Sequence, residues 1–383
     1  MTQADPFEHA RGRLGFGCMR LPRLEDGEID IPQFSQMVDA FLDAGFNYFD
    51  TAHVYLEGKS EPAIRQALTS RHARDEYFLV DKLTNGNFNS TEEIVPLLEE
   101  ELAACGVEYF DLLLMHAQSR ESYAKYQRLG AYEEAYKLVR DGRVRDGRVR
   151  HFGISFHDTA EVLDQILAEH PEVECVQLQL NYLDWDDVSV QSRACYEVCR
   201  AHGKPVMVME PIKGGTLATL PPAAAEALAQ TCPDAPASYA LRFAGGHEGV
   251  AMVLSGMGTT EQMAQNIKTF SPLEPLSEEE LAGLARVVNV MHEQDVVACT
   301  ACRYCVEGCP RSIDIPALFA CLNAKRAYGD RGQAFYYNNV HTKGRGRASD
   351  CVRCGKCEHT CPQHLPIREL LQDVAAEFEV PAE

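Results

Sequence analysis

The chain lacks the features that mark exported and membrane proteins. Its N-terminus contains no apolar stretch and therefore does not read as a secretory signal peptide. No uninterrupted apolar run approaches the roughly 20 residues that a membrane-spanning helix needs. We therefore expect a cytoplasmic protein without a membrane partner, in which the 15 cysteines stay reduced and serve metals rather than disulfides.

Basic residues are also in short supply. The 383 residues include 36 Lys and Arg against 57 Asp and Glu, which gives a net charge of −21. The acidic excess lies in residues 1–296, because residues 297–383 are close to neutral. Binding to nucleic acid requires a basic face, so this composition argues against a nucleic-acid partner.

Eight cysteines form one pattern written twice. Each run reads C-x2-C-x2-C-x3-C and is followed by proline: Cys299, Cys302, Cys305 and Cys309, then Cys351, Cys354, Cys357 and Cys361. In such runs three cysteines hold one [4Fe–4S] cluster and the fourth holds the other cluster. This rule assigns Cys361 to the first cluster and Cys309 to the second. Structural zinc is the alternative, but it would leave the third closely spaced cysteine of each run idle. We therefore expect two [4Fe–4S] clusters.

Short apolar runs alternate with longer amphipathic segments from residue 14 to about 270. This alternation is typical of parallel strands joined by helices. The first strand is not followed by the G-x-G-x-x-G sequence of a Rossmann domain. We predict an α/β fold, a (β/α)8 TIM barrel over residues 1–296, followed by a small α-helical, bacterial-ferredoxin-like domain over residues 297–383. The expected strands are Leu14–Met19, Asn47–Asp50, Tyr77–Leu83, Phe110–His116, Arg150–Ser155, Cys175–Asn181, Pro205–Glu210 and Val250–Ser255. Helices are expected over Ile31–Ala44, Ser90–Cys105, Thr159–Glu169, Asp187–His202 and Ser277–Glu293.

Three polar residues stand at the ends of three consecutive expected strands. They are Asp50, Lys82 and His116, each about one β/α unit from the next. The C-terminal ends of barrel strands meet at one mouth, where barrel enzymes keep their chemistry. Tyr55 follows Asp50 closely enough to fold back over the same mouth. Each residue alone is more simply a cap, a rim residue or loop packing, but three in register indicate a site.

These four residues suit the reduction of a carbonyl group. A hydride that reaches the carbonyl carbon places negative charge on the oxygen, which must then receive a proton. Tyr55 could donate it, and an ammonium group at Lys82 would favour the phenolate and lower the pKa of the tyrosine. Asp50 would keep Lys82 charged and oriented, while His116 would donate a hydrogen bond to the oxygen.

These motifs resemble the signature of the aldo-keto reductases. The resemblance covers roughly residues 12–270 and rests on these segments, in order: Gly45–Tyr55, Gly58–Glu61, Val80–Lys82, Asp111–His116 and Arg150–Ser155. The whole chain is similar to the subgroup with a C-terminal ferredoxin-like domain. The resemblance implies a catalytic tetrad of Asp50, Tyr55, Lys82 and His116 with Tyr55 as proton donor. It also implies a (β/α)8 barrel that binds NADP(H) or NAD(H) without a Rossmann fold.

The same resemblance implies a set of nucleotide contacts. Ser155 and Gln177 match the positions that bind the nicotinamide carboxamide, and Met209 takes the place of an aromatic residue that stacks on the ring. Asn266 matches an adenine-binding asparagine, but the basic partner of the 2′-phosphate is Gln262 here, which leaves NADH open beside NADPH. Two Gly-rich loops fit the pyrophosphate, as barrel phosphate sites also predict. They contain Lys213, Gly214, Gly215 and Leu217 after the seventh strand, and Ser255, Gly256 and Gly258 after the eighth.

Three functions are compatible with this sequence. The leading hypothesis is an NAD(P)H-dependent reductase of small-molecule carbonyl compounds that carries a cluster domain. The second is an electron-transfer protein whose clusters serve a partner ferredoxin or flavodoxin, with the barrel as a docking module. The third is a redox sensor that responds to nucleotide binding. A hydride carries two electrons and a cluster passes one, so coupling the two halves usually needs a flavin or a radical-tolerant substrate.

Overall fold

The protein is described here by a computed structural model that covers residues 5–140, 147–186, 190–292, 296–297, 299, 303–328, 333–342, 344–361, 363 and 365–379. The chain divides into two compact units. The first comprises residues 1–218 and 237–277, and the second comprises residues 219–236 and 278–383. The short segment 219–236 thus belongs with the C-terminal part of the chain.

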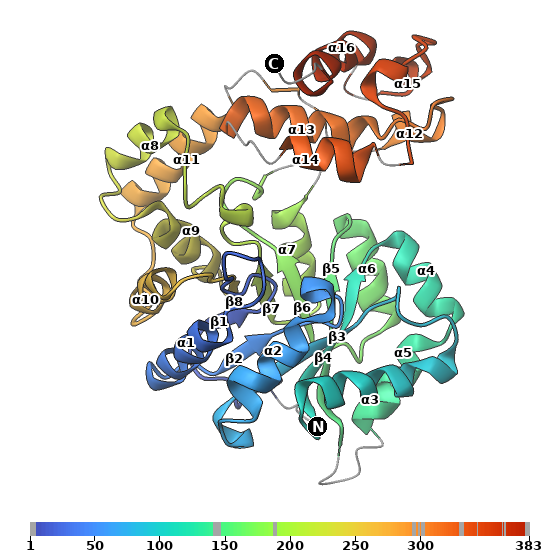
Figure 1. The fold of residues 1–383 in the computed structure, drawn as a ribbon. Helices are drawn as coiled ribbons and strands as arrows, with labels where there is room; N and C mark the ends of the chain where they lie inside the picture. Colours follow the sequence, from blue (N-terminus) through green and yellow to red (C-terminus); the bar gives the residue numbers. More distant parts are fainter. Residues whose placement is uncertain are drawn as a thin grey trace. The chain divides into compact units, whose positions relative to one another are not determined.

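The first unit is a closed barrel of eight parallel strands (Figure 1). Each strand pairs with its sequence neighbours, and β1 closes the barrel against β8. All eight predicted strands are present, which confirms the predicted fold class. The strands are β1 Leu14–Gly17, β2 Tyr48–Asp50, β3 Phe78–Leu83, β4 Phe110–Gln118, β5 Val149–Phe156, β6 Cys175–Gln179, β7 Val206–Met209 and β8 Val250–Ser255.

Helices follow the strands and cover the outside of the barrel. Helix α1 begins where the carboxylate of Asp30 accepts a hydrogen bond from the backbone N–H of Gln33, and α3 ends at Gly106, whose φ of 69° suits glycine. The helices of this unit are α1 Ile31–Asp43, α2 Ser60–Ile64, α3 Ile94–Cys105, α4 Arg120–Arg128, α5 Ala131–Arg140, α6 Ala160–Glu169, α7 Ser192–Ala201, α9 Pro236–Gly245 and α10 Thr260–Thr269. The helix predicted from Asp187 begins at Ser192, and residues 187–189 lie outside the described part of the chain.

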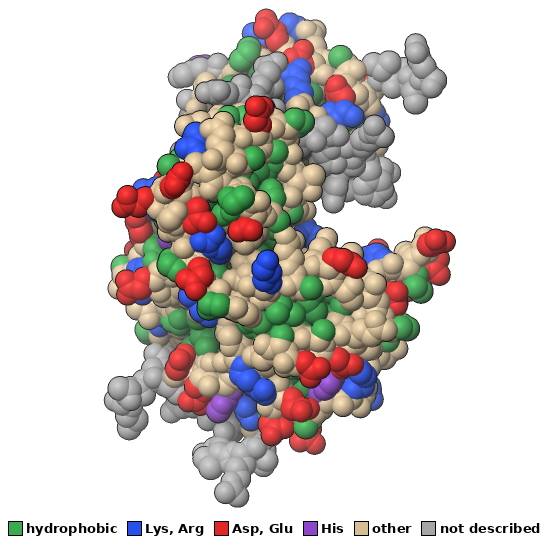
Figure 2. Space-filling model, turned by 90° about the vertical axis from the view of Figure 1, so that its left-hand side faces the viewer, with side chains coloured by type: hydrophobic (Ala, Val, Ile, Leu, Met, Phe, Trp, Pro, Cys, Tyr) green, Lys and Arg blue, Asp and Glu red, His purple; other side chains and the backbone are tan. Residues whose placement is uncertain are grey.

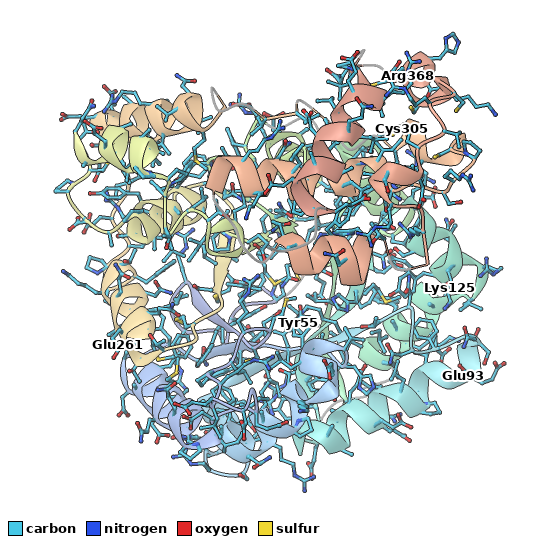
Figure 3. All side chains as sticks on the ribbon, turned by 45° about the horizontal axis from the view of Figure 1, so that its top comes forward. Tyr55, Glu93, Lys125, Glu261, Cys305 and Arg368 are labelled. Atoms are coloured by element: carbon cyan, nitrogen blue, oxygen red, sulfur yellow. The ribbon has the colours of Figure 1, made fainter. Side chains whose placement is uncertain are left out.

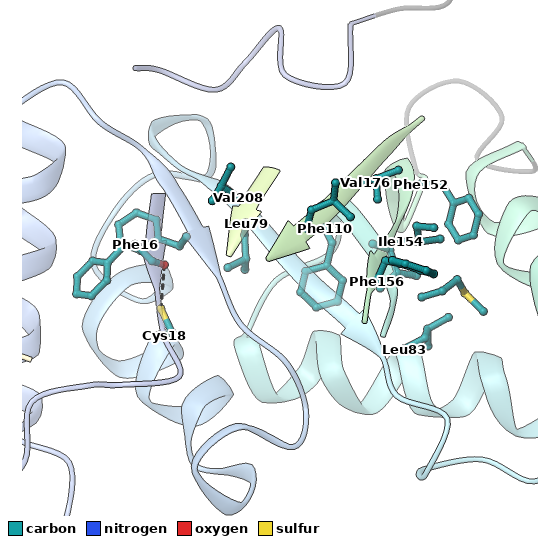
Figure 4. Packing of buried hydrophobic residues seen from close by; sticks show 14 of the residues in the cluster. Phe16, Cys18, Leu79, Leu83, Phe110, Phe152, Ile154, Phe156, Val176 and Val208 are labelled. Carbon is teal, nitrogen blue, oxygen red and sulfur yellow. Dashed lines mark hydrogen bonds between the residues drawn. The ribbon is translucent and has the colours of Figure 1, made fainter. Parts of the chain in front are cut away.

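Apolar side chains fill two layers of the barrel unit. Inside the barrel, Tyr48, Phe78 and Met207 belong to one buried cluster. A larger cluster lies between the strands and the surrounding helices, and Figure 4 shows part of it around Phe16 and Phe110. The barrel is therefore a packed core, and chemistry is confined to the ends of its strands.

The second unit is helical. Its core is formed by apolar residues of two long helices together with several of the motif cysteines. An isolated β-bridge pairs Ile313, which follows the first cysteine run, with Gly346, which precedes the second. The chains approach closely there: a side chain at Gly346 would lie 2.4 Å from the carbonyl oxygen of Arg311. The helices are α8 Pro222–Ala229, α11 Glu278–His292, α12 Tyr304–Glu307, α13 Ile315–Tyr328, α14 Gln333–Tyr336, α15 Lys356–Thr360 and α16 Ile367–Phe378.

None of the described helices combines the length and the apolar character that crossing a bilayer requires. On the face shown in Figure 2, acidic side chains are scattered among basic ones rather than grouped by sign.

Candidate active site

The four predicted catalytic residues converge at one end of the barrel. Asp50 is the last residue of β2, Lys82 lies near the end of β3, and His116 lies near the end of β4. The Lys82 Nζ donates to Oδ1 of Asp50 at 2.6 Å, and it lies 4.7 Å from the centre of the Tyr55 ring. The Tyr55 and His116 rings meet edge to face at 5.9 Å. Figure 3 places Tyr55 near the centre of the barrel unit, with Glu93, Lys125 and Glu261 around its rim.

A tight turn after β2 returns Tyr55 to the mouth. The 3-10 turn Tyr55–Gly58 has positive φ at Leu56, Glu57 and Gly58, which reverses the chain within one turn. The following helix is anchored by Ser60, whose hydroxyl lies 2.8 Å from that of Thr51 and donates to the Cys18 carbonyl oxygen. The tyrosine is thus placed by its loop rather than by a strand.

The lysine–aspartate pair is fully enclosed. Lys82 is 0% exposed and Asp50 is 3% exposed. Burial opposes the charge of Lys82, but Asp50 and Tyr55 outweigh it and raise the pKa of the lysine above its usual value. Lys82 also donates to the backbone oxygen of Thr51 at 2.6 Å. The ammonium group is therefore permanently charged and held by two acceptors.

The tyrosine does not have the lowered pKa expected from its neighbour. Burial raises the pKa of Tyr55 above its ordinary value, and Lys82 offsets this only in part. The prediction named the right neighbour and the right direction for its effect, but the net shift is upward because burial dominates. Tyr55 is therefore a protonated phenol at neutral pH.

His116 is held as a neutral imidazole. Burial, with smaller contributions from Lys82 and His157, lowers the pKa of His116 to about 3. Its Nδ1 lies 2.6 Å from the hydroxyl oxygen of Thr84. If Thr84 donates to Nδ1, the ring proton resides on Nε2.

The two residues expected near the nicotinamide are buried beside this tetrad. Gln177 donates from Nε2 to Oδ2 of Asp50 at 3.1 Å, the carboxylate oxygen that Lys82 does not use. The Ser155 hydroxyl accepts the backbone N–H of Ala117 at 2.8 Å, where β4 is irregular and the φ of Ala117 is 49°. Both side chains therefore have fixed orientations, Ser155 near the end of β5 and Gln177 in the middle of β6.

The loop after β7 carries the remaining predicted contacts of that strand. Met209 is the last residue of β7 and is half-buried. Lys213 forms an ion pair with Oδ1 of Asp184 at 2.5 Å, while Gly214 and Gly215 have positive φ and are exposed. Leu217 is fully buried, so its side chain packs in the protein interior. The exposed backbone of this loop lies at the two glycines.

The loop after β8 leads into helix α10. Ser255 is buried and accepts a hydrogen bond from Nδ2 of Asn266 at 2.9 Å. Gly256 is exposed, whereas the Gly258 N–H donates to Oε1 of Gln262 at 2.8 Å. Gln262 thus already occupies one amide of the Gly-rich loop.

Sequence reasoning missed one cation at this site. Arg20, which follows β1, lies between the two Gly-rich loops: a Cβ built at Gly214 would be 3.6 Å from its Nη2, and one at Gly256 would be 3.3 Å from its Cβ. Its guanidinium is 3.8 Å from the Glu210 carboxylate and about half exposed. The sequence offered one indication of this residue, an arginine directly after the first expected strand.

The motif cysteines line two apolar cavities in the second unit. One is lined by Cys309 together with Cys351, Cys354 and Cys357. The other is lined by Cys299, Cys305 and Cys361. Cys302 lies outside the described residues. Each cavity therefore combines cysteines of one run with the fourth cysteine of the other, and thiolates in an apolar surround fit iron–sulfur ligation.

Two family models match the chain. Residues 13–289 match the aldo/keto reductase family, and residues 298–365 match a 4Fe-4S dicluster domain. The chain belongs to the aldo/keto reductase family. The predicted family is thereby confirmed, together with a C-terminal domain of the iron–sulfur type.

Curated relatives carry reductase names. The chain is 25% identical over 203 residues to an aldo-keto reductase of Bombyx mori, and this match covers 52% of this chain and 62% of that protein. It is 29% identical over 123 residues to the methylglyoxal reductase YeaE of Escherichia coli, and this match covers 32% of this chain and 39% of that protein. It also shares 33% identity over 113 residues with an NAD(P)H-dependent D-xylose reductase of Candida tenuis, covering 28% and 31% of the two chains. The matches thus span less than two thirds of each of these relatives.

Solved structures share the fold. The holo form of an aldo-keto reductase from Bacillus halodurans has a TM-score of 0.59 at 22% identity, covering 72% of this chain and 91% of that one. An aldo/keto reductase from Klebsiella pneumoniae in complex with NADP and acetate has a TM-score of 0.57 at 22% identity, with the same coverage.

Proposed function

We propose that the barrel reduces a small carbonyl compound with NADH or NADPH, and that Tyr55 donates the proton. The convergence of Tyr55 with the buried Lys82–Asp50 pair and a neutral His116 is the observation that carries this proposal. The names of relatives that act on methylglyoxal and xylose point the same way. Family membership and the barrel fold support it further.

Each side chain has a definite task in this reaction. When bound, the reduced nicotinamide supplies the hydride. The raised pKa of Tyr55 keeps the phenol protonated, so the donor is loaded before the substrate arrives. The Lys82 ammonium stabilises the phenolate that remains after transfer, and Asp50 fixes the ammonium. His116 donates from Nε2 to the substrate oxygen, where negative charge develops.

The residues around the mouth fit a dinucleotide. Ser155 and Gln177 would orient the carboxamide, with Met209 beside the ring, while Asn266 would contact the adenine. The exposed backbone of Gly214 and Gly256 would meet the pyrophosphate beside Gly215, whose own N–H donates to the Ile212 carbonyl oxygen at 3.0 Å. Arg20 would add a cation between the two loops. The position expected to pair with a 2′-phosphate holds the neutral Gln262, so we propose that NADH is accepted as readily as NADPH.

The cluster part of the proposal concerns residues 297–383, which would hold two [4Fe–4S] clusters. Cys299, Cys302, Cys305 and Cys361 would hold one, and Cys309, Cys351, Cys354 and Cys357 the other. The grouping of the cysteines into two cavities supports this assignment. These clusters would pass single electrons to or from a ferredoxin or flavodoxin in the cytoplasm, where thiolates stay reduced.

A stopped-flow experiment tests the proposal. Anaerobic, cluster-loaded protein is mixed with NADH or NADPH, with and without methylglyoxal, while nucleotide and cluster absorbance are followed. We expect nucleotide oxidation that requires the aldehyde, persists in Tyr136→Phe and is lost in Tyr55→Phe; Tyr136 is an exposed tyrosine of the barrel unit. Cluster bleaching without aldehyde would instead support an electron-transfer protein. Neither nucleotide oxidation nor cluster bleaching would support a sensor.

A further inference from the structure

Three carboxyl groups are buried together beside the catalytic lysine. They belong to Glu61 on α2, Asp81 on β3 and Glu101 on α3, and they are 1%, 0% and 0% exposed. Adjacent residues of a strand point to opposite faces, so Asp81 points toward the helices while Lys82 points into the barrel. Charged groups are rarely buried without partners, because burial removes their hydration.

Glu101 shows the conflict most clearly. Neither oxygen of its side chain has a hydrogen-bond partner, although both are buried. The residue lies on the apolar face of α3, next to the buried Leu97, Leu98 and Leu102. Asp81 is better satisfied, since its Oδ1 accepts the Lys82 backbone N–H and its Oδ2 lies 3.6 Å from the Cys105 sulfur. The unsatisfied carboxylate therefore needs another partner.

An imidazole completes the cluster. The Nδ1 atom of His53 lies 3.3 Å and 3.2 Å from the two carboxylate oxygens of Glu61. One ligand atom each from His53, Glu61 and Glu101 can be chosen so that all three lie within 4.8 Å of one another. His53 is about one quarter exposed, which gives this otherwise enclosed group an opening to solvent.

We propose that His53, Glu61 and Glu101 bind a divalent transition-metal ion such as Zn²⁺ or Mn²⁺. Imidazole and carboxylate are the usual donors to such ions. Two carboxylates and a neutral imidazole around a divalent ion carry no net charge, which suits a buried site. Ligand atoms about 2.1 Å from one ion lie at most about 4.2 Å apart, so small side-chain rotations complete the geometry.

The competing state of these groups is protonated carboxyls. Burial raises the pKa of Glu61 to about 7 and raises the pKa of Glu101 well above its usual value. Protons could thus neutralise the group without an ion, but in the geometry present neither oxygen of Glu101 is within hydrogen-bond distance of a partner. An ion satisfies both requirements at once. It would also join the loop after β2, helix α2 and helix α3.

Titration with Mn²⁺ tests the site in the full, cluster-loaded chain. Mn²⁺ prefers oxygen and nitrogen donors, so it leaves the motif cysteines alone. The EPR signal of free Mn²⁺ gives the bound amount. We expect one tight site in the wild type and in the control Glu100→Gln, an exposed neighbour on the same helix. Glu101→Gln and His53→Gln should each weaken binding by at least about tenfold.

Two outcomes would overturn the proposal. One is a wild-type protein that binds neither Mn²⁺ nor, by equilibrium dialysis, Zn²⁺ beyond the amount bound by Glu101→Gln; the carboxyls are then protonated instead. The other is unchanged affinity in both variants. If Glu101→Gln fails to fold by circular dichroism, the partly exposed His53→Gln decides the result.

Discussion

Removing the Lys82 side chain in Lys82→Met should destabilise the barrel by about 3–5 kcal/mol, because it leaves the Asp50 carboxylate buried without its cation. The two charged groups are 2.6 Å apart and almost fully enclosed. Their attraction is about 6 kcal/mol at an effective dielectric constant of about 20, but the cost of dehydrating both groups offsets most of it. Each single variant should therefore lose more stability than expected from its share of the double variant, in which both charges are removed.

The double variant Asp50→Asn with Lys82→Met isolates this interaction. We expect it to lose at least about 2 kcal/mol less than the sum of the two single variants, since no unpaired charge remains. All three variants should lack reductase activity, so they are compared by their free energies of unfolding. The double-mutant cycle then gives the coupling energy between Asp50 and Lys82.

The chain offers a convenient probe for this cycle. Trp185 is the sole tryptophan and lies in the barrel unit, where it stacks on His247 at 4.3 Å. Its fluorescence in urea therefore follows unfolding of the barrel rather than of the cluster domain. A coupling energy below about 0.5 kcal/mol, within the range of independent sites, would refute the reasoning.

Three further predictions concern other parts of the chain. The pKa of His116 is about 3 in the folded protein against about 6.5 in the unfolded chain, so its contribution to stability is complete above pH 6.5 and is lost as the pH falls toward 3. This group should cost about 1 kcal/mol between pH 7 and 5.5, and His116→Gln should remove that share of the slope in the Trp185 assay, while His157 and His247, whose pKa values are also lowered, keep theirs. Gln262→Arg should raise the NADPH/NADH ratio of kcat/KM about tenfold, whereas Ala264→Arg on the same helix should not; equal ratios would count against the 2′-phosphate explanation. Cys309→Ser should lower the iron and sulfide content by up to about half, while Cys321→Ser, outside both cavities, should leave it unchanged.

The barrel and the position of the tetrad could be predicted because both depend on local pattern. Each strand is a short apolar run, and a polar residue at its end stops the run where the strand leaves the core. Asp50, Lys82 and His116 follow this rule, so their convergence needed no knowledge of contacts. The order of the strands then followed from the alternation with helices.

Properties that depend on how deeply a side chain is buried, or on contacts between residues far apart in the sequence, could not be predicted from the sequence. The sequence places Lys82 near Tyr55, but it does not say how deeply the phenol is buried, and burial decides the direction of the pKa shift. The hydrogen bond from Gln177 to Asp50 joins strands that are not neighbours. Arg20 approaches two loops that follow the last two strands, and only closure of the barrel brings them together.

The buried carboxyls are different, because the sequence carried a signal for one of them. Helix α3 buries Ile94, Leu97, Leu98 and Leu102 at helical spacing, and Glu101 falls on the same face. A carboxylate on the apolar face of a helix must be neutralised, whereas exposed acidic residues need no partner. Its ligand neighbours, Glu61 and His53, lie far earlier in the chain, so only the fold identifies them. An acidic residue at a core position is thus a stronger pointer to an ion than any number of acidic residues on the surface.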